Sequence, residues 1–233
     1  MKFLFRLILL FLFLISASGV TAQQNIFNTD EIYGSDPLLY NGRYYSFFPP
    51  LNTEGNQYLK DSRFEAGSVT IRGVTYPSLL LNYDIFNQHL VMQYKNNIGA
   101  ANLVILSQAW LETFSFAGKD FELISTQDTL KRIFQVIGTG SKRIFYYWTK
   151  DLKMDSFYGS KKHAFSVARK EMNLFTGKQI LKYRNNKSFI YLFDPQTRIA
   201  VKEYLRMHKI NVKKAADQTM TELIYYCNTL YEK

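Results

Sequence analysis

Cysteine and histidine are scarce in this chain of 233 residues, which has one Cys and three His. A single thiol excludes an internal disulfide and the multi-cysteine zinc and iron–sulfur sites. His89, His163 and His208 lie far apart, and no His-x-x-x-His or Cys-x-x-Cys pair occurs. His208 falls on the apolar side of a predicted helix, where a packed histidine is more common than a ligand. We therefore expect no metal site and no cofactor.

The usual catalytic motifs are missing as well. The chain has no Gly-x-Ser-x-Gly nucleophile elbow, and Gly138-x-Gly140 lacks the Gly-Lys-Ser/Thr ending of a phosphate-binding loop. Asp84, His89 and Ser107 could approach one another across a hairpin, but such a triple arises by chance in a chain with many Ser and Asp residues. We expect no catalytic residue and a protein that is not an enzyme. The alternative is a secreted hydrolase whose acid/base pair the sequence does not reveal.

The first 22 residues have the three parts of a secretory signal peptide. Lys2 and Arg6 accompany an unbroken apolar run from Leu7 to Ile15, and the small residues of Val20-Thr21-Ala22 fit a cleavage site before Gln23. The run is shorter than the ~20 apolar residues of a membrane-spanning helix. We therefore expect export to the periplasm or the cell exterior, with no transmembrane span in the mature chain.

Charge is divided unevenly along the sequence. Residues 23–130 contain six Lys and Arg against eleven Asp and Glu, a net charge of −5, whereas residues 131–233 contain 21 against eight, a net charge of +13. Either the two halves face each other or the basic half meets an anionic partner. Nucleic acid is not expected as that partner, because no recognised binding motif appears and export removes the usual targets.

The middle of the sequence has the pattern of β-hairpins in series. Short runs rich in Val, Ile, Thr, Tyr and Phe alternate with turn residues, for example Arg72-Gly73 and Ala117-Gly118-Lys119-Asp120. Hydrophobic residues at 47% and aromatic residues at 16% provide ample core. Hairpins without regular helices between them favour an antiparallel sheet. We expect a mostly β protein, with a curled antiparallel meander (an open barrel or sandwich-like) over residues 23–185.

The pattern becomes helical in a basic C-terminal segment, residues 186–233. Asp194-Pro195 is typical of a helix N-cap followed by proline at the first helical position. Asp217 or Thr219 can cap the final helix, and Thr219-x-x-Glu222 matches a capping box. Two short helices cannot form a hydrophobic core alone, so we expect them to pack on the β domain as a cap. Cys227 lies in an apolar stripe with helical spacing, which predicts a buried thiol.

One cationic pattern remains after the core positions are assigned. Arg198, Lys202 and Arg206 recur every four residues, and Lys209 follows three residues later. On a helix these side chains form a ridge opposite the apolar face. A solvated basic surface is the simplest interpretation. The functional hypothesis is a weak dock onto anionic lipid headgroups or an acidic envelope protein.

Two parts of the sequence form recognisable patterns. The first is the hairpin pattern of Glu65–Tyr76 followed by Leu81–Ile85, and the second comprises Asn186–Phe189, Lys202–Leu205, His208–Ile210 and the closing Tyr226-Cys227-Asn228. These patterns resemble a group of exported proteins of unknown function that is common in Bacteroidota. The resemblance implies export from a bacterium with two membranes and assigns no functional residue. We therefore expect an exported, non-catalytic envelope protein that acts through ligand binding or assembly.

Overall fold

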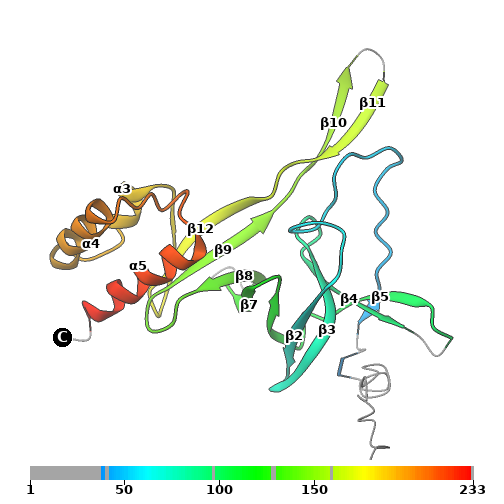
Figure 1. Cartoon of the computed structure of the whole chain (residues 1–233), viewed down its shortest axis with the longest axis horizontal. Coiled ribbons are helices and arrows are strands. Elements are labelled where there is room, and N and C mark those ends of the chain that lie inside the picture. The colour runs from blue at the N-terminus through cyan, green and yellow to red at the C-terminus, as the bar shows by residue number, and fades with distance from the viewer. Residues whose placement is uncertain (1–37, 40–41, 96–97, 127–129, 158–159, 232–233) are drawn as a thin grey trace, which may run out of the picture.

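The described part of the chain contains thirteen strands and three helices (Figure 1). The structure is a computed structural model, which describes residues 38–39, 42–95, 98–126, 130–157 and 160–231. The predicted signal peptide, residues 1–22, lies outside the described residues.

Eleven of these strands form one antiparallel sheet. Their bounds are β1 Arg43–Tyr44, β2 Glu65–Ile71, β3 Val74–Asp84, β4 His89–Lys95, β5 Ala101–Ile105, β6 Leu111–Phe116, β7 Lys119–Ser125, β8 Lys131–Ile137, β9 Arg143–Thr149, β12 Arg169–Phe175 and β13 Ile180–Tyr183. The order across the sheet is β1-β5-β4-β3-β2-β6-β7-β8-β9-β12-β13, so the sheet stays open and most neighbours are joined by hairpins. The predicted antiparallel meander is thus confirmed.

Tight turns explain why consecutive strands pair. Arg72 and Gly73, between β2 and β3, both have positive φ, at 50° and 77°. Ala117 and Gly118, between β6 and β7, repeat this geometry with φ of 52° and 70°. Two positive φ angles in succession make the hairpin turn whose twist matches that of the strands. The second turn is therefore shorter than the predicted Ala117–Asp120, because Lys119 and Asp120 already belong to β7.

The strands from β2 to β7 enclose an aromatic core. Tyr83 packs edge-on against Phe114 and Phe121, with ring centroids 5.7 and 5.5 Å apart, and the two phenylalanines stack at 4.5 Å. All three rings are buried. Burying a side chain of this size stabilises the fold by about 1.5–3 kcal/mol, so this cluster fixes the N-terminal half of the sheet.

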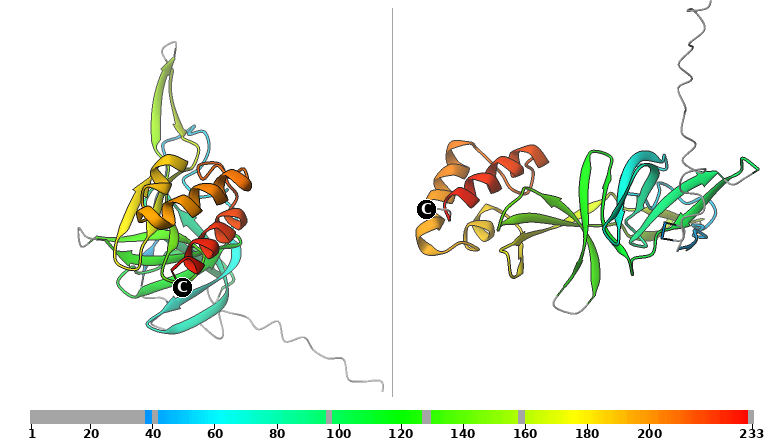
Figure 2. Two further views of the ribbon diagram at one scale, coloured as in Figure 1. Left: turned by 90° about the vertical axis from the view of Figure 1, so that its left-hand side faces the viewer. Right: turned by 90° about the horizontal axis from the view of Figure 1, so that it is seen from below.

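The three helices cover one end of the sheet, beside β8, β9 and β12, and form the second core (Figures 1 and 2). They are α3 Asn186–Ile190, α4 Pro195–Met207 and α5 Asp217–Thr229. Asp194 accepts hydrogen bonds from the backbone amides of Gln196 and Thr197, which confirms the predicted N-cap of α4. Cys227 is buried on α5, as predicted. No helix in the described ranges is long and apolar enough to span a membrane.

Two details of the helical prediction are wrong. The final helix begins at Asp217 with Ala216 at the N-cap, so neither Asp217 nor Thr219 is the cap and the predicted Thr219–Glu222 capping box does not start the helix. His208 is the exposed C-cap of α4 and stacks on Tyr204, with ring centroids 4.2 Å apart, rather than joining the apolar face. The first residue of α5 is two positions before Thr219, and the last residue of α4 is one position before His208.

A two-stranded arm extends from the sheet. β10 Leu152–Phe157 and β11 Ser160–Phe165 pair with each other and continue the ribbon of β9 and β12 away from the helices (Figure 1). The segment around Glu54 runs along the base of β11, where its backbone amide donates to His163 O at 2.8 Å and its carbonyl accepts from Phe165 N at 2.9 Å. A third strand-like segment therefore supports the base of the arm.

Candidate functional site

The four predicted cationic residues do not form one continuous ridge. Arg198 is half-buried and serves the fold, since its Nη2 donates to Phe193 O at 3.0 Å and its guanidinium lies 4.7 Å from the Tyr191 ring centroid. Arg206 forms an ion pair with Glu203 at 2.7 Å. Lys202 and Lys209 are exposed. Lys209 follows the end of the helix in a left-handed conformation, with φ of 51°, so it does not lie on α4 itself.

The same side of α4 carries apolar side chains that the sequence analysis missed. Ile199 and Met207 are 69% and 72% exposed. With 3.6 residues per turn, Ile199, Lys202 and Arg206 fall within one side of the helix and Met207 lies at its border. We call Ile199, Lys202, Arg206, Met207 and the following Lys209 the α4 face.

The α4 face occupies an end of the molecule. In two perpendicular views α4 lies at the extremity opposite the β1-β5 edge of the sheet (Figures 1 and 2). Further exposed basic side chains in the helical segment are those of Lys187, Lys213 and Lys214, and Arg184 lies just before it. The end of the molecule therefore combines positive charge with exposed apolar surface.

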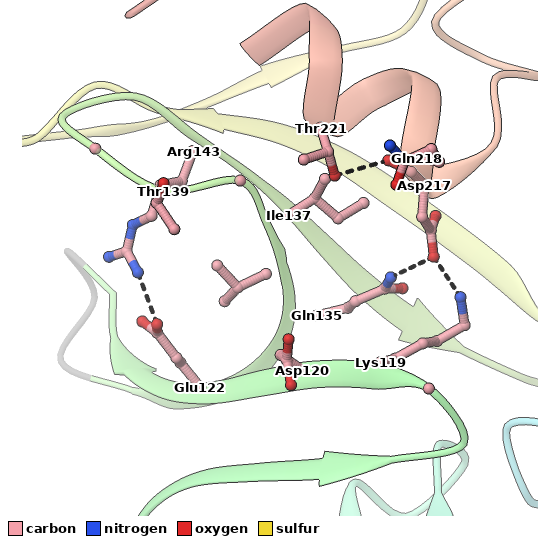
Figure 3. Close-up of a pocket in the computed structure, with 14 residues that line it drawn as sticks. Lys119, Asp120, Glu122, Gln135, Ile137, Thr139, Arg143, Asp217, Gln218 and Thr221 are labelled. Carbon is pink, nitrogen blue, oxygen red and sulfur yellow. Dashed lines mark hydrogen bonds and ion pairs between the residues drawn. The ribbon is translucent and has the colours of Figure 1, made fainter. Parts of the chain in front are cut away.

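A separate, polar cleft of about 820 Å³ lies where the first turn of α5 meets β7, β8 and the turn after β8 (Figure 3). Its polar lining includes two ion pairs, Lys119 with Asp217 and Arg143 with Glu122, the latter at 2.7 Å. Val136 adds apolar surface to the lining, whereas Ile137 is buried in the core beneath α5. The cleft thus places two paired carboxylates around a small apolar patch.

A hydrogen-bond chain orients Asp217. Trp148 Nε1 donates to Gln135 Oε1 at 2.8 Å, and Gln135 Nε2 donates to Asp217 Oδ2 at 2.7 Å. Lys119 Nζ donates to the same carboxylate oxygen. Gln135 is buried with both ends of its amide engaged, so its orientation is fixed. These hydrogen bonds therefore hold the Asp217 carboxylate in one position in the cleft.

The protonation state of Asp217 follows from the same contacts. Burial raises the pKa of this carboxyl, but the hydrogen bonds from Lys119 and Gln135, together with the nearby Lys119 and Lys170 charges, outweigh burial and hold the pKa below its usual value. Lys170, whose Nζ lies 4.0 Å from the Tyr146 ring centroid, has a pKa lowered by burial. Asp217 is consequently a stable carboxylate at neutral pH, suited to accepting hydrogen bonds rather than donating a proton.

The opposite wall of the cleft is tied to α5. Asn228 Nδ2 donates to Thr139 O at 2.7 Å and to Lys142 O at 3.0 Å, and its Oδ1 accepts from Lys142 N at 2.9 Å. A Cβ on Gly138 would overlap Ile224 Cγ2, so the turn lies directly against the helix. The turn and α5 therefore hold each other in place, and the cleft is largely preformed.

The structure brings two of the three residues considered as a hydrolase triad to one cavity. His89 and Ser107 line one cavity of about 500 Å³. The buried Asp84 carboxylate is directed elsewhere, since it accepts hydrogen bonds from Tyr45 Oη at 2.7 Å and Asn87 Nδ2 at 2.8 Å. Among the described residues there is also no group of three or more His, Cys, Asp or Glu arranged to hold a metal ion.

Comparison of the chain with protein-family models, curated proteins and solved structures gives no match. The candidate sites therefore stand on geometry and chemistry alone.

Proposed function

We propose that this chain is an exported, non-catalytic protein of the cell envelope that docks on an anionic lipid surface through the α4 face. The observation that carries the proposal is the exposure of Ile199 and Met207 on the side of α4 that also bears Lys202 and Arg206. Apolar and cationic side chains on one exposed helix face are the combination that binds the boundary between headgroups and acyl chains. The location of α4 at an end of the described part of the molecule favours such contact.

The energetics require both kinds of side chain. A basic group near an anionic membrane contributes about 1 kcal/mol. Lys202 and Lys209 make no ion pair within the described ranges, whereas Glu203 offsets part of the Arg206 charge. The two lysines together supply about 2 kcal/mol, which corresponds to about 30-fold in affinity. Ile199 and Met207 add an apolar component that salt does not screen, so binding should weaken at high ionic strength without vanishing.

Sedimentation with vesicles tests the docking. Wild-type protein should pellet with vesicles of 30% phosphatidylglycerol in phosphatidylcholine at low salt, and Lys202→Gln/Lys209→Gln should reduce the affinity about 30-fold. Ile199→Ser/Met207→Ser should remove the component that persists at high salt. The matched control is Lys131→Gln/Lys153→Gln, which makes the same charge change at exposed positions outside the helical segment. Failure of the wild type to pellet, or equal losses in the control, would refute the proposal. If the protein pelleted only when an envelope protein was added, the α4 face would bind a protein partner and the lipid proposal would be wrong.

Export is tested separately. When the full chain is expressed in a bacterium with two membranes, we expect the protein outside the cytoplasm with a mature N-terminus at Gln23. N-terminal sequencing of the fractionated protein measures this directly. A chain that stayed in the cytoplasm with its first 22 residues intact would contradict export while leaving the vesicle result to be judged by itself.

The state of the acidic groups supports a binding role rather than hydrolysis. Glu122 and Asp217 are each engaged by a basic side chain, and the pKa of Asp217 is lowered. A general acid working at neutral pH needs the opposite shift. The arrangement of charges in the cleft is therefore suited to hydrogen bonding with a ligand.

A further inference from the structure

We propose that the cleft between α5 and the β7–β9 part of the sheet binds a neutral, polyhydroxylated ligand, that is, a segment of uncharged carbohydrate. This inference is independent of the α4 face. It starts from the volume of the cleft, about 820 Å³, which lies within the range of about 300–1,000 Å³ found for small-molecule sites. Such a space accommodates a short oligosaccharide, with polar side chains and Val136 in its lining.

The free oxygens of the two carboxylates supply the acceptors. Asp217 uses Oδ2 for both Lys119 and Gln135, and Glu122 uses Oε1 for Arg143. Within the described part of the chain, Asp217 Oδ1 and Glu122 Oε2 accept no hydrogen bond. A carboxylate oxygen accepts strongly from hydroxyl donors. Each ion pair can therefore bind a ligand hydroxyl without being broken.

Donors lie beside these acceptors. Arg143 commits Nη1 to Glu122, and its remaining N–H groups can donate to a ligand oxygen. The exposed amide of Gln218, in the first turn of α5, and the Thr139 hydroxyl add groups from both walls. A sugar hydroxyl both donates and accepts, so a row of hydroxyls satisfies such a mixed lining. Purely donating or purely accepting ligands would leave half of the lining unpaired.

The charge of the cleft argues for a neutral ligand. Lys119 and Arg143 are already compensated by Asp217 and Glu122, and Asp120 leaves the lining with a small negative excess. An anionic ligand would have to displace a carboxylate from its base, and breaking a partly buried pair leaves an uncompensated charge. A neutral polyol avoids that cost. Val136, which is half-buried in the lining, can contact the C–H face of a sugar ring.

Several polar groups of the cleft are fixed in position before a ligand binds. The Trp148–Gln135–Asp217 chain fixes one carboxylate, and Asn228 fixes the turn that carries Thr139. Groups held in position before binding lose little conformational entropy when a ligand arrives. The cleft therefore differs from an ordinary surface depression, in which polar side chains must first be ordered.

Saturation-transfer NMR and calorimetry with soluble neutral hexasaccharides test the proposal, using the hexamers of maltose, cellulose, mannan and chitin type as probes at up to 10 mM. We expect saturable binding of at least one of them by the wild type. Gln218→Trp, which fills the cleft from an exposed position, should weaken that binding at least tenfold. The matched control is Gln196→Trp, because Gln196 occupies the equivalent second position of α4, is also exposed, and does not line the cleft.

The remaining outcomes are decisive as well. If Gln218→Trp does not fold by circular dichroism, Thr139→Trp blocks the cleft from its opposite wall and replaces it. Absence of binding by the wild type to all four hexasaccharides overturns the proposal, as does binding that survives both blocking variants. Cleft-dependent binding only of charged saccharides or of peptides also overturns it, because the inferred ligand is neutral and polyhydroxylated.

Discussion

Replacing Gly138 by alanine tests how rigidly α5 packs against the sheet. Gly138 has φ of 80°, a conformation that costs a residue with a side chain about 1–2 kcal/mol. The new Cβ would overlap Ile224 Cγ2 and lie 3.5 Å from Ile224 Cβ. Ile224 is fully buried and branched at Cβ, so its side chain has few alternative positions. Overpacking of this kind costs about 1–3 kcal/mol more.

A second glycine separates the two costs. Gly118 has φ of 70° in the β6–β7 turn, and a Cβ added there meets nothing within 4 Å. Gly118→Ala should therefore lower the free energy of unfolding by about 1–2 kcal/mol through backbone strain alone. Gly138→Ala should lower it by about 2–5 kcal/mol, the sum of strain and overpacking. Urea denaturation followed by tryptophan fluorescence and circular dichroism measures both.

Ile224→Leu provides the rescue experiment. Leucine has the same number of carbons but no Cγ2 branch at the point of overlap, and such a change usually costs less than about 1.5 kcal/mol. In the Ile224→Leu background, Gly138→Ala should cost no more than Gly118→Ala does. Equal costs of the two glycine substitutions in the wild-type background would refute the reasoning, since the β8–β9 turn would then move freely away from α5.

Two further predictions concern titration and reactivity. Because the pKa of Asp217 is lower in the folded than in the unfolded chain, its ion pair with Lys119 should stabilise the protein fully above about pH 4 and progressively less as the pH falls below that value. The difference in urea midpoint between wild type and Asp217→Asn should therefore shrink on acidification. A constant difference would contradict the lowered pKa. Burial raises the pKa of the Cys227 thiol to about 12, so a disulfide reagent at pH 8 should modify it only as fast as the protein unfolds, whereas stoichiometric labelling of the native protein within seconds would show an open helical core.

Features written within a few neighbouring residues were predictable. The Arg72-Gly73 turn and the Asp194-Pro195 helix start depend on backbone preferences of the residues themselves, and both are present in the structure. The burial of Cys227 follows from helical spacing over three turns. Such local signals are strong because the chemistry that fixes the conformation lies in the same short segment.

The cleft was not predictable, because its parts come from distant segments. Lys119 and Asp217 are separated by 98 positions in the sequence, and Gln135 lies between them in a strand that looks like any other. The one signal in the sequence was Gln135 itself, a polar residue among the apolar residues of its strand. A buried amide needs hydrogen-bond partners, so its position indicated that partners lie nearby. The predicted cationic ridge was wrong at Arg198 for a different reason. Spacing alone placed Arg198 on a solvated ridge, whereas carbonyl groups at the end of α3 provide it with internal acceptors.

The two proposed surfaces meet in α5 yet should act independently. The first turn of α5 forms a wall of the cleft, while its later residues pack on α4, where Tyr226 stacks on Tyr204 with ring centroids 4.2 Å apart. Vesicle binding requires the exposed side of α4. Saccharide binding requires the cleft, to which α5 contributes its first turn. Gln218→Trp should therefore weaken saccharide binding at least tenfold and leave vesicle binding intact. Lys202→Gln/Lys209→Gln should weaken vesicle binding about 30-fold and leave saccharide binding intact. Because Gly138→Ala acts on the packing of α5 itself, it is the substitution expected to weaken both, and loss of both activities in either surface variant would show that α5 had separated from the sheet.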